Sequence, residues 1–200
     1  SLLEAATAKL AAAPSSAKTF TTSAHVASAE QLPVGSASID IVLVGSAWHW
    51  FKAAALSEIE RVLKPGGAIF VFEYQFPKLE SDTMGLNEWV RRQFNETWKF
   101  EDQVPRGNLY EKTQSLRDHS EFSQIASRYL EKSLDHSADF FSEMIFSQAR
   151  FLDFETRNEK QKVLDVRNET REHVKTRFGT RKEAAFAYRF EGFLFQKRQV

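Results

Sequence analysis

The stretch that decides the fold is residues 38–74, SIDIVLVGSAWHWFKAAALSEIERVLKPGGAIFVFEY. Residues 39–45 are apolar almost throughout, and Asp40 is their only charge. They show no alternation of apolar and polar side chains, which is typical of a strand buried on both faces of a parallel sheet. Residues 68–74, AIFVFEY, have the same character and predict a second buried strand.

The segment between these strands has the pattern of an amphipathic helix over residues 51–63. Its apolar positions recur every three to four residues, at Leu56, Ile59, Val62 and Leu63. The following Lys64-Pro65-Gly66-Gly67 is typical of a helix end, since it supplies a cation, a breaker and residues that tolerate left-handed backbone. A strand, a helix and a second strand of these lengths form a right-handed parallel crossover. We therefore expect an α/β fold with a mostly parallel sheet flanked by helices.

The composition favours one soluble, cytoplasmic domain over residues 1–200. The 27 basic residues equal the 27 acidic ones, so no overall positive field exists to hold a nucleic acid or an anionic membrane. The absence of cysteine excludes disulfides, thiolate metal sites and a cysteine nucleophile, and suits a reducing cytosol. No stretch has the roughly 18 apolar residues of a membrane span, and the N-terminus lacks the pattern of a signal peptide.

Outside the central unit the sequence predicts further helices and strands. The alanine-rich residues 1–13 favour a helix whose beginning lies before Ser1, and residues 20–28 favour a short strand followed by a loop. Toward the C-terminus, helical spacing predicts helices over residues 84–100, 120–132 and 155–177, whereas residues 139–151 fit a strand or a helix. Alternation in residues 184–198 predicts a terminal antiparallel strand at or near a sheet edge.

Residues 23–74 resemble the second half of a class I, Rossmann-like S-adenosylmethionine-dependent methyltransferase. The resemblance rests on the order of an Ala-Glu-x-Leu-Pro loop, an Asp-x-Val strand, a His-Trp-Phe turn and an Arg-Val-Leu-Lys-Pro-Gly-Gly helix end. It is strongest to the small-molecule branch that includes the trans-aconitate methyltransferases. The resemblance implies methyl transfer to a small molecule, at a carboxylate or hydroxyl oxygen. It also implies that residues 80–135 form a helical insert that covers the substrate.

The resemblance also implies which residues contact S-adenosylmethionine. Ligands of an open parallel sheet lie beyond the carboxyl ends of the strands, where residues 28–32 and 45–50 are both expected. Ala29 would offer its backbone amide to the adenine, and Ser28 or Glu30 would accept from the adenine's exocyclic amine. The methionine portion would lie along Ser46, Ala47 and Trp48. Ser28 stands where many relatives have an aspartate, so its hydroxyl would supply a weaker, uncharged hydrogen bond.

The family's other cofactor motifs have no counterpart upstream in these 200 residues. A glycine-rich turn after a first strand and an acid ending the second strand normally hold such a cofactor. We therefore expect the chain to be a fragment of a longer enzyme or a remnant without the main cofactor anchors. A chain without those strands would expose a sheet edge, through which it would self-associate.

Two tryptophans and two titratable residues are the candidates for chemistry and substrate binding. His49 is the candidate catalytic base; it is equally suited to orient a substrate carboxylate or to pack between the two tryptophans. Trp50, Glu73 and Trp89 are the candidate substrate-binding residues. For each the alternative is structural: Trp50, like Phe51, would anchor the turn in the core, Glu73 would pair with an arginine, and Trp89 would pack in a helical core.

Several arginines are suited to bind a substrate carboxylate in bidentate geometry, and nothing in the sequence selects among Arg91, Arg92 and Arg150. The remaining histidines lack metal-ligand spacing with acids, so we expect no metal. Two hypotheses stay open. The first is a methyltransferase acting on a small metabolite, and the second is a non-catalytic, methyltransferase-like module for binding or assembly. A nucleic-acid methyltransferase fits less well, because the charge is balanced and the strand at 39–45 is not followed by an Asn-Pro-Pro-aromatic turn.

Overall fold

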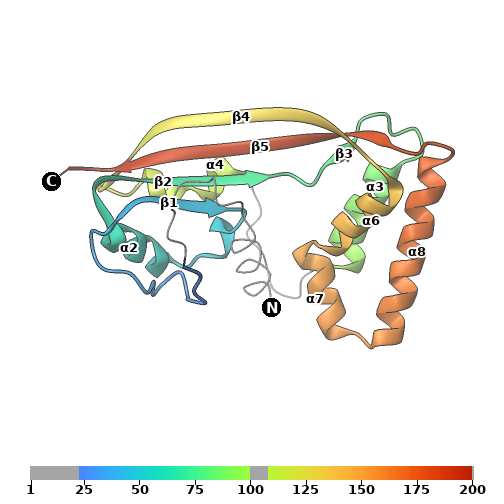
Figure 1. Ribbon diagram of the computed structural model, residues 1–200, viewed down its shortest axis with the longest axis horizontal. Helices are drawn as coiled ribbons and strands as arrows, with labels where there is room; N and C mark the ends of the chain where they lie inside the picture. The colour runs from blue at the N-terminus through green and yellow to red at the C-terminus, as the bar shows by residue number, and fades with distance from the viewer. Residues whose placement is uncertain (1–22, 100–107, 200) are drawn as a thin grey trace, which may run out of the picture.

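The computed structural model of the chain describes residues 23–99 and 108–199 (Figure 1). The predicted helix over residues 1–13 therefore lies outside the described residues. The strands are β1 (Ile39–Gly45), β2 (Leu63–Tyr74), β3 (Lys78–Leu79), β4 (Phe122–His136) and β5 (Ala184–Lys197). The α-helices are α2 (Ala53–Val62), α3 (Leu86–Arg92), α4 (Leu109–Lys112), α5 (Gln114–Arg117), α6 (Ala138–Phe146), α7 (Ala149–Arg157) and α8 (Lys160–Phe178). A 3₁₀ turn, η1 (Trp48–Trp50), follows β1, and a π-helical segment, η2 (Gln93–Thr97), continues α3.

The central crossover forms as the sequence predicts, but the expected burial of residues 39–45 on both faces is wrong, because Ile41 and Leu43 are exposed. β1 pairs with β2 in parallel, with Val42 opposite Ile69 and Val44 opposite Val71, and α2 connects the two strands. The helix ends at Val62, and β2 begins one residue later, at Leu63. The register breaks between the pairs Ile39–Leu63 and Ile41–Ala68, so the Lys-Pro-Gly-Gly segment forms an irregularity inside the strand. Gly66 adopts a φ of 75° there, a conformation that glycine reaches without steric cost.

The sheet is mixed, and the predicted α/β class with flanking helices is confirmed. β1, β2 and β5 lie side by side in that order, and β4 covers the other side of β5 (Figure 1). The β1–β2 pair is parallel, whereas β5 runs antiparallel to β2, β3 and β4. The terminal strand is thus antiparallel, as predicted. It lies near the edge of the sheet, as predicted, with β2 on one side and the edge strand β4 on the other.

Two predicted elements are corrected. Residues 120–132 were expected to be helical, but β4 pairs with β5 from Phe122–Lys197 to His136–Ala184. Most β4 side chains are exposed, so burial favours neither a helical nor a strand pattern in this segment. The long-range pairing with β5 therefore decides its conformation. The predicted insert at 80–135 is consequently helical only as far as Arg117. The strand expected over residues 20–28 is also wrong for its described part, since residues 23–27 have no regular structure.

The ambiguous residues 139–151 lie in helices, α6 and the beginning of α7. The charged residues 155–177 are helical, as predicted, apart from the turn between α7 and α8. The expected helix at 84–100 is present as α3 and its π-helical continuation. Among the helices of the described residues, none combines the length and the apolar character that crossing a bilayer requires.

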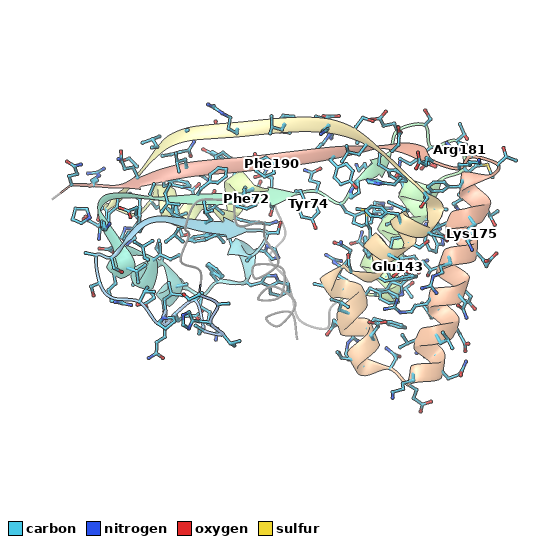
Figure 2. All side chains as sticks on the ribbon, in the orientation of Figure 1. Phe72, Tyr74, Glu143, Lys175, Arg181 and Phe190 are labelled. Atoms are coloured by element: carbon cyan, nitrogen blue, oxygen red, sulfur yellow. The ribbon has the colours of Figure 1, made fainter. Side chains whose placement is uncertain are left out.

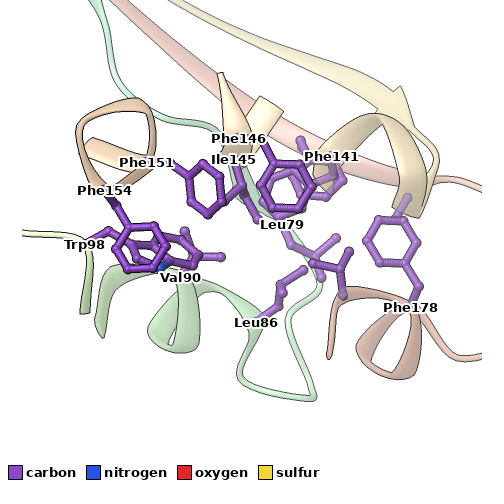
Figure 3. Packing of buried hydrophobic residues seen from close by; sticks show 13 residues of the cluster. Leu79, Leu86, Val90, Trp98, Phe141, Ile145, Phe146, Phe151, Phe154 and Phe178 are labelled. Atoms are coloured by element: carbon purple, nitrogen blue, oxygen red, sulfur yellow. The ribbon is translucent and has the colours of Figure 1, made fainter. Parts of the chain in front are cut away.

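The buried side chains form two separate clusters. The first, which we call the sheet core, lies around β1, β2 and β5 and includes Trp48, Ile59, Ile69, Leu109, Leu116 and Phe195. The second, the helical cluster, joins α3, α6, α7 and α8 beneath the far end of β5 (Figures 1 and 3). It is rich in aromatic residues, among them Trp98, Phe141, Phe146, Phe151, Phe178 and Phe186. β4 and β5 run from one cluster to the other, so both clusters share one sheet.

Candidate active site

The carboxyl end of β1 turns sharply into the His-Trp segment. Ser46 adopts a φ of 49°, in the left-handed region that a residue with a side chain rarely occupies. Its backbone amide donates to the Phe72 carbonyl oxygen over 2.7 Å, which extends the pairing of β1 with β2 by one residue. The Trp50 amide then donates to the Ala47 carbonyl oxygen over 2.9 Å and closes η1. The turn therefore places Trp48 and His49 just beyond the carboxyl ends of both parallel strands.

Trp48 anchors this turn in the sheet core. Its side chain is buried, and its ring lies 5.6 Å from that of Phe51. The indole Nε1 donates to the backbone carbonyl oxygen of Lys112, in α4, over 2.9 Å. Because a buried indole N–H is costly to leave unpaired, this bond ties α4 to the end of β1.

Lys112 makes a second contact with the same edge of the sheet. Its Nζ lies 3.1 Å from Oε2 and 3.3 Å from Oε1 of Glu73, at the end of β2. The side chains are only 14% and 17% exposed, so the pair is partly desolvated and less screened than a surface ion pair. The carboxylate of Glu73 is therefore engaged in an ion pair at this edge of the sheet. Its partner is a lysine from α4, which sequence reasoning missed.

His49 lies next to this ion pair with its ring partly buried. Burial lowers the pKa of His49, the positive charge of Lys112 lowers that pKa further, and the carboxylate of Glu73 opposes both effects. Its Nδ1 is buried and has no hydrogen-bond partner among the residues that the structure describes. The Trp50 ring, half exposed, lies 5.0 Å from the imidazole. Burial and the ammonium of Lys112 thus favour the neutral form of the imidazole, which can accept a proton or a hydrogen bond.

A cavity of about 310 Å³ opens beside these residues. That volume is in the range of small-molecule sites. The helix α2 forms one wall, and α4 and α5 form the opposite wall. The lining includes Trp48, His49, Phe51, Lys52, Lys112 and Ser115.

The loop that precedes β1 approaches the same region. The Gln31 amide donates to the Ser28 carbonyl oxygen over 3.1 Å, which closes a turn that contains Ala29 and Glu30. The Ser28 hydroxyl donates to the Glu30 carboxylate, and this bond is the main reason that the pKa of Glu30 is lowered; the backbone and the ammonium of Lys52 contribute as well. Glu30 is thus close to the beginning of α2. The structure thus brings the predicted loop at residues 28–32 close to the beginning of α2, which follows the other predicted loop at residues 45–50.

A salt-bridge network fixes that loop to α2. Glu58 Oε1 accepts from the Leu32 amide over 2.7 Å, and Arg61 donates to both oxygens of Glu58, each over 2.7 Å. Arg61 also donates to the Val34 carbonyl oxygen over 3.0 Å. These bonds lower the pKa of Glu58 to about 2, with Arg61 the largest contribution and the Leu32 amide the next. Glu58 and Arg61 are three residues apart on one helix, a spacing that predicts their pairing but not the loop that they hold.

Four other candidates lie away from this cavity. Trp89 belongs to the helical cluster, where its ring stacks on His173 at 5.1 Å, so its predicted role in substrate binding has no support from its position. Arg91 pairs with Glu88 on its own helix, at 2.6 Å, and Arg92 lies 3.7 Å from the same carboxylate. Arg150 donates to the Phe94 carbonyl oxygen over 2.6 Å. None of these arginines lines the cavity beside His49, which Lys52 and Lys112 do.

Comparison with known proteins places this site in a family context. Residues 2–71 match the methyltransferase domain family. The match covers the predicted cofactor loops, the crossover helix and most of β2. It supports the methyltransferase resemblance of the sequence and says nothing of the acceptor.

Curated relatives and a solved structure agree with that match. An uncharacterized methyltransferase of Mycobacterium tuberculosis is 47% identical over 49 residues, which are 24% of this chain and 20% of that protein. A counterpart in Mycobacterium bovis gives the same values, so the chain spans only about a fifth of these curated relatives. A candidate type II methyltransferase of Anaeromyxobacter dehalogenans superimposes with a TM-score of 0.57 at 18% identity, covering 88% of this chain and 71% of that structure. The chain thus shares the α/β fold of that protein.

Proposed function

We propose that this chain carries out S-adenosylmethionine-dependent methyl transfer to the oxygen of a small molecule. The observation that carries the proposal is the cavity beyond the carboxyl ends of β1 and β2, which Trp48, His49 and Lys112 line. The match to the methyltransferase domain family supports the reaction class. Since the chain spans part of its curated relatives, the proposal concerns the chemistry of this site and leaves the rest of the molecule aside.

The residues at the strand ends fit the cofactor. The Glu30 carboxylate is partly exposed and ionised at neutral pH, so it can accept from the exocyclic amine of an adenine. Ser28 and Ala29 lie in the same turn and would contact the adenine. The methionine portion would lie along Ser46, Ala47 and Trp48, where the sharp turn after β1 exposes backbone beyond the sheet. Bound there, S-adenosylmethionine supplies an electrophilic methyl group on a sulfonium.

The acceptor would occupy the cavity beside His49. We propose that Trp50 contacts the acceptor from one side. Glu73 would act on the acceptor indirectly, through its ion pair with Lys112. A carboxylate acceptor needs no base, because its oxygen is already ionised, so orientation and exclusion of water would suffice. A hydroxyl acceptor gives up a proton, and the neutral imidazole of His49 is the group that would take it. The branch that includes the trans-aconitate methyltransferases remains our proposal for the subfamily.

Calorimetric titration with S-adenosylhomocysteine tests the proposal without knowledge of the acceptor. We expect saturable one-to-one binding, and we expect Glu30→Ala to weaken it about tenfold, the loss of one hydrogen bond to a charged group. Glu131→Ala is the matched control, since that glutamate pairs with Arg189 on the β4–β5 ribbon, away from the loops. A folded chain that binds no S-adenosylhomocysteine contradicts the proposal and favours the non-catalytic module.

Self-association is a separate proposal for the non-catalytic alternative. Ile41 and Leu43, on β1, are 55% and 64% exposed in the described structure, and they leave an apolar strip on one face of the sheet. Such surface favours association with a second copy or with another segment. Light scattering over a range of protein concentrations tests this directly, because a monomer at every concentration excludes association.

A further inference from the structure

Lys112, in α4, contacts the residues at the ends of both parallel strands through separate groups. Its carbonyl oxygen accepts from the Trp48 indole, and its ammonium pairs with Glu73. The two contacts use backbone and side chain, so they fix the orientation of the residue as well as its position. The helix α4 is thereby attached to the ends of both β1 and β2.

The local structure of α4 prepares Lys112 for this role. The helix is only four residues long, too short to be stable by itself. Asn108 and Glu111 form a capping box, in which the Asn108 side chain accepts from the Glu111 amide over 2.9 Å. The cap begins the helix at a defined residue, and the contacts of Lys112 then fix its other end against the sheet.

The surroundings of His49 give this arrangement a chemical consequence. The charged groups on the elements around the imidazole are Lys112 from α4, Glu73 from β2 and Lys52 at the beginning of α2. Lys112 opposes protonation of the ring, and Glu73 favours it. The two groups are paired with each other, so removing either one leaves the remaining charge beside His49 uncompensated.

We propose that Lys112 is a positioning residue of this site, which fixes α4 against Trp48 and Glu73 as one wall of the cavity and holds its ammonium group beside the imidazole of His49. Its role in catalysis rests on the proposed methyl transfer, whereas its effect on the imidazole does not. With the ring uncharged, a lone pair is available for the proton of a hydroxyl group. The acceptor class that this arrangement suits is therefore an alcohol or phenol, whose proton passes to His49 as the oxygen becomes nucleophilic.

Histidine titration by NMR tests the inference without cofactor or acceptor. The chain has five histidines, and His49→Gln assigns the signal. We expect Lys112→Met to shift the midpoint of the His49 titration to higher pH, because a cation is removed and the Glu73 carboxylate is left alone. Glu73→Gln should shift it to lower pH. If the two substitutions only loosened the site, the His49 midpoint would shift in the same direction in both variants, toward that of an exposed histidine.

Two further variants complete the experiment. Lys64→Met removes another paired lysine, bound to Asp40 at 2.7 Å at the opposite end of β2, and it should leave the His49 midpoint unchanged. Lys112→Arg should keep the midpoint near that of the parent chain, because it keeps the charge. An unchanged midpoint in both Lys112→Met and Glu73→Gln would overturn the inference. A shift in opposite directions, in a chain that fails to bind S-adenosylhomocysteine, would instead contradict the proposed function and leave the role of Lys112 intact.

Discussion

The sheet core and the helical cluster bury apolar side chains to similar completeness but differ in what accompanies them. Around the sheet core, the buried Trp48 leads directly to a lysine, a glutamate and a histidine. The helical cluster instead fills its interior with aromatic rings, such as Phe141 and Phe186 stacked 4.4 Å apart (Figure 3). Its charged pairs, for example Arg171 with Glu143, lie on the outside of the helices. Aromatic richness therefore marks a packing unit here, and the proposed chemistry lies where a few polar groups are held close together.

The boundary between the two regions lies along β5. Phe72, Tyr74 and Phe190 lie where β2 ends and β5 continues toward the helices (Figure 2). The rings of Phe72 and Phe190 are 5.6 Å apart, across paired strands. Glu143 and Lys175 belong to α6 and α8 on the far side (Figure 2). Because β5 runs through both regions, the effects of substitutions in the sheet core and in the helical cluster can be compared in the same molecule.

The largest expected effect comes from the helical cluster. Phe186→Ala removes a fully buried ring that contacts Phe141 and Phe178. We expect the free energy of unfolding to fall by about 3–5 kcal/mol, as for other buried aromatic truncations, when measured by urea denaturation. Leu152→Ala, at a residue that is 46% exposed on α7, is the control and should change it by less than about 0.5 kcal/mol. Equal losses for both variants would show that the cluster is not packed as described.

Removal of the indole N–H at the sheet core should have an intermediate effect. Trp48→Phe keeps an aromatic ring but leaves the Lys112 carbonyl oxygen without its donor. We expect a loss of about 1–3 kcal/mol in the free energy of unfolding, the cost of an unpaired buried polar group. The His49 titration should change as well, since α4 is no longer attached to β1. Retention of both properties would mean that the bond contributes nothing to the site.

Two helix caps allow a matched comparison of the regions. Ser137 caps α6 by accepting from the Phe140 amide over 3.2 Å, and Asn108 caps α4. Ser137→Ala and Asn108→Ala should each cost about 1 kcal/mol in the free energy of unfolding. Only Asn108→Ala should also alter the His49 titration, because α4 forms a wall of the cavity. An effect of Ser137→Ala on that titration would show that the two regions are coupled.

The smallest expected effect is a pH dependence at the loop before β1. The pKa of Glu58 is lowered to about 2, below its ordinary value of 4.5, so the folded state binds this proton less readily than the unfolded state. The stabilisation is therefore complete above about pH 4.5 and is lost as the pH falls toward 2. Thermal unfolding measured at pH 7 and pH 3.5 should show a smaller acid-induced decrease in Glu58→Gln than in the parent chain. The same decrease in both chains would contradict the network with Arg61 and Leu32.

The sequence predicted well wherever local pattern and burial agree. The apolar runs of β1 and β2 are buried on the side that packs against α2, and the helix between them ends where the Lys-Pro-Gly-Gly segment begins. Prediction failed for residues 120–132, since a charged, exposed segment carries little periodic signal and its pairing partner lies some 60 residues further along the chain. The arginine candidates failed for another reason. Arg91 and Arg92 pair with Glu88 on their own helix, and Arg150 donates to the Phe94 carbonyl oxygen of a remote segment.

The sequence alone determined the parallel crossover, its two strand-end loops and the presence of His49 and Glu73 at one edge of the sheet. Those features depend on neighbours within a single supersecondary unit, for which apolar periodicity and helix-ending residues suffice. Only the tertiary structure selected Lys112 over the arginines and assigned Trp89 to a packing role. A lysine 39 residues from Glu73 reaches it through the folding of the intervening helices. Such a contact depends on the burial and orientation of two remote segments, and no local pattern encodes either.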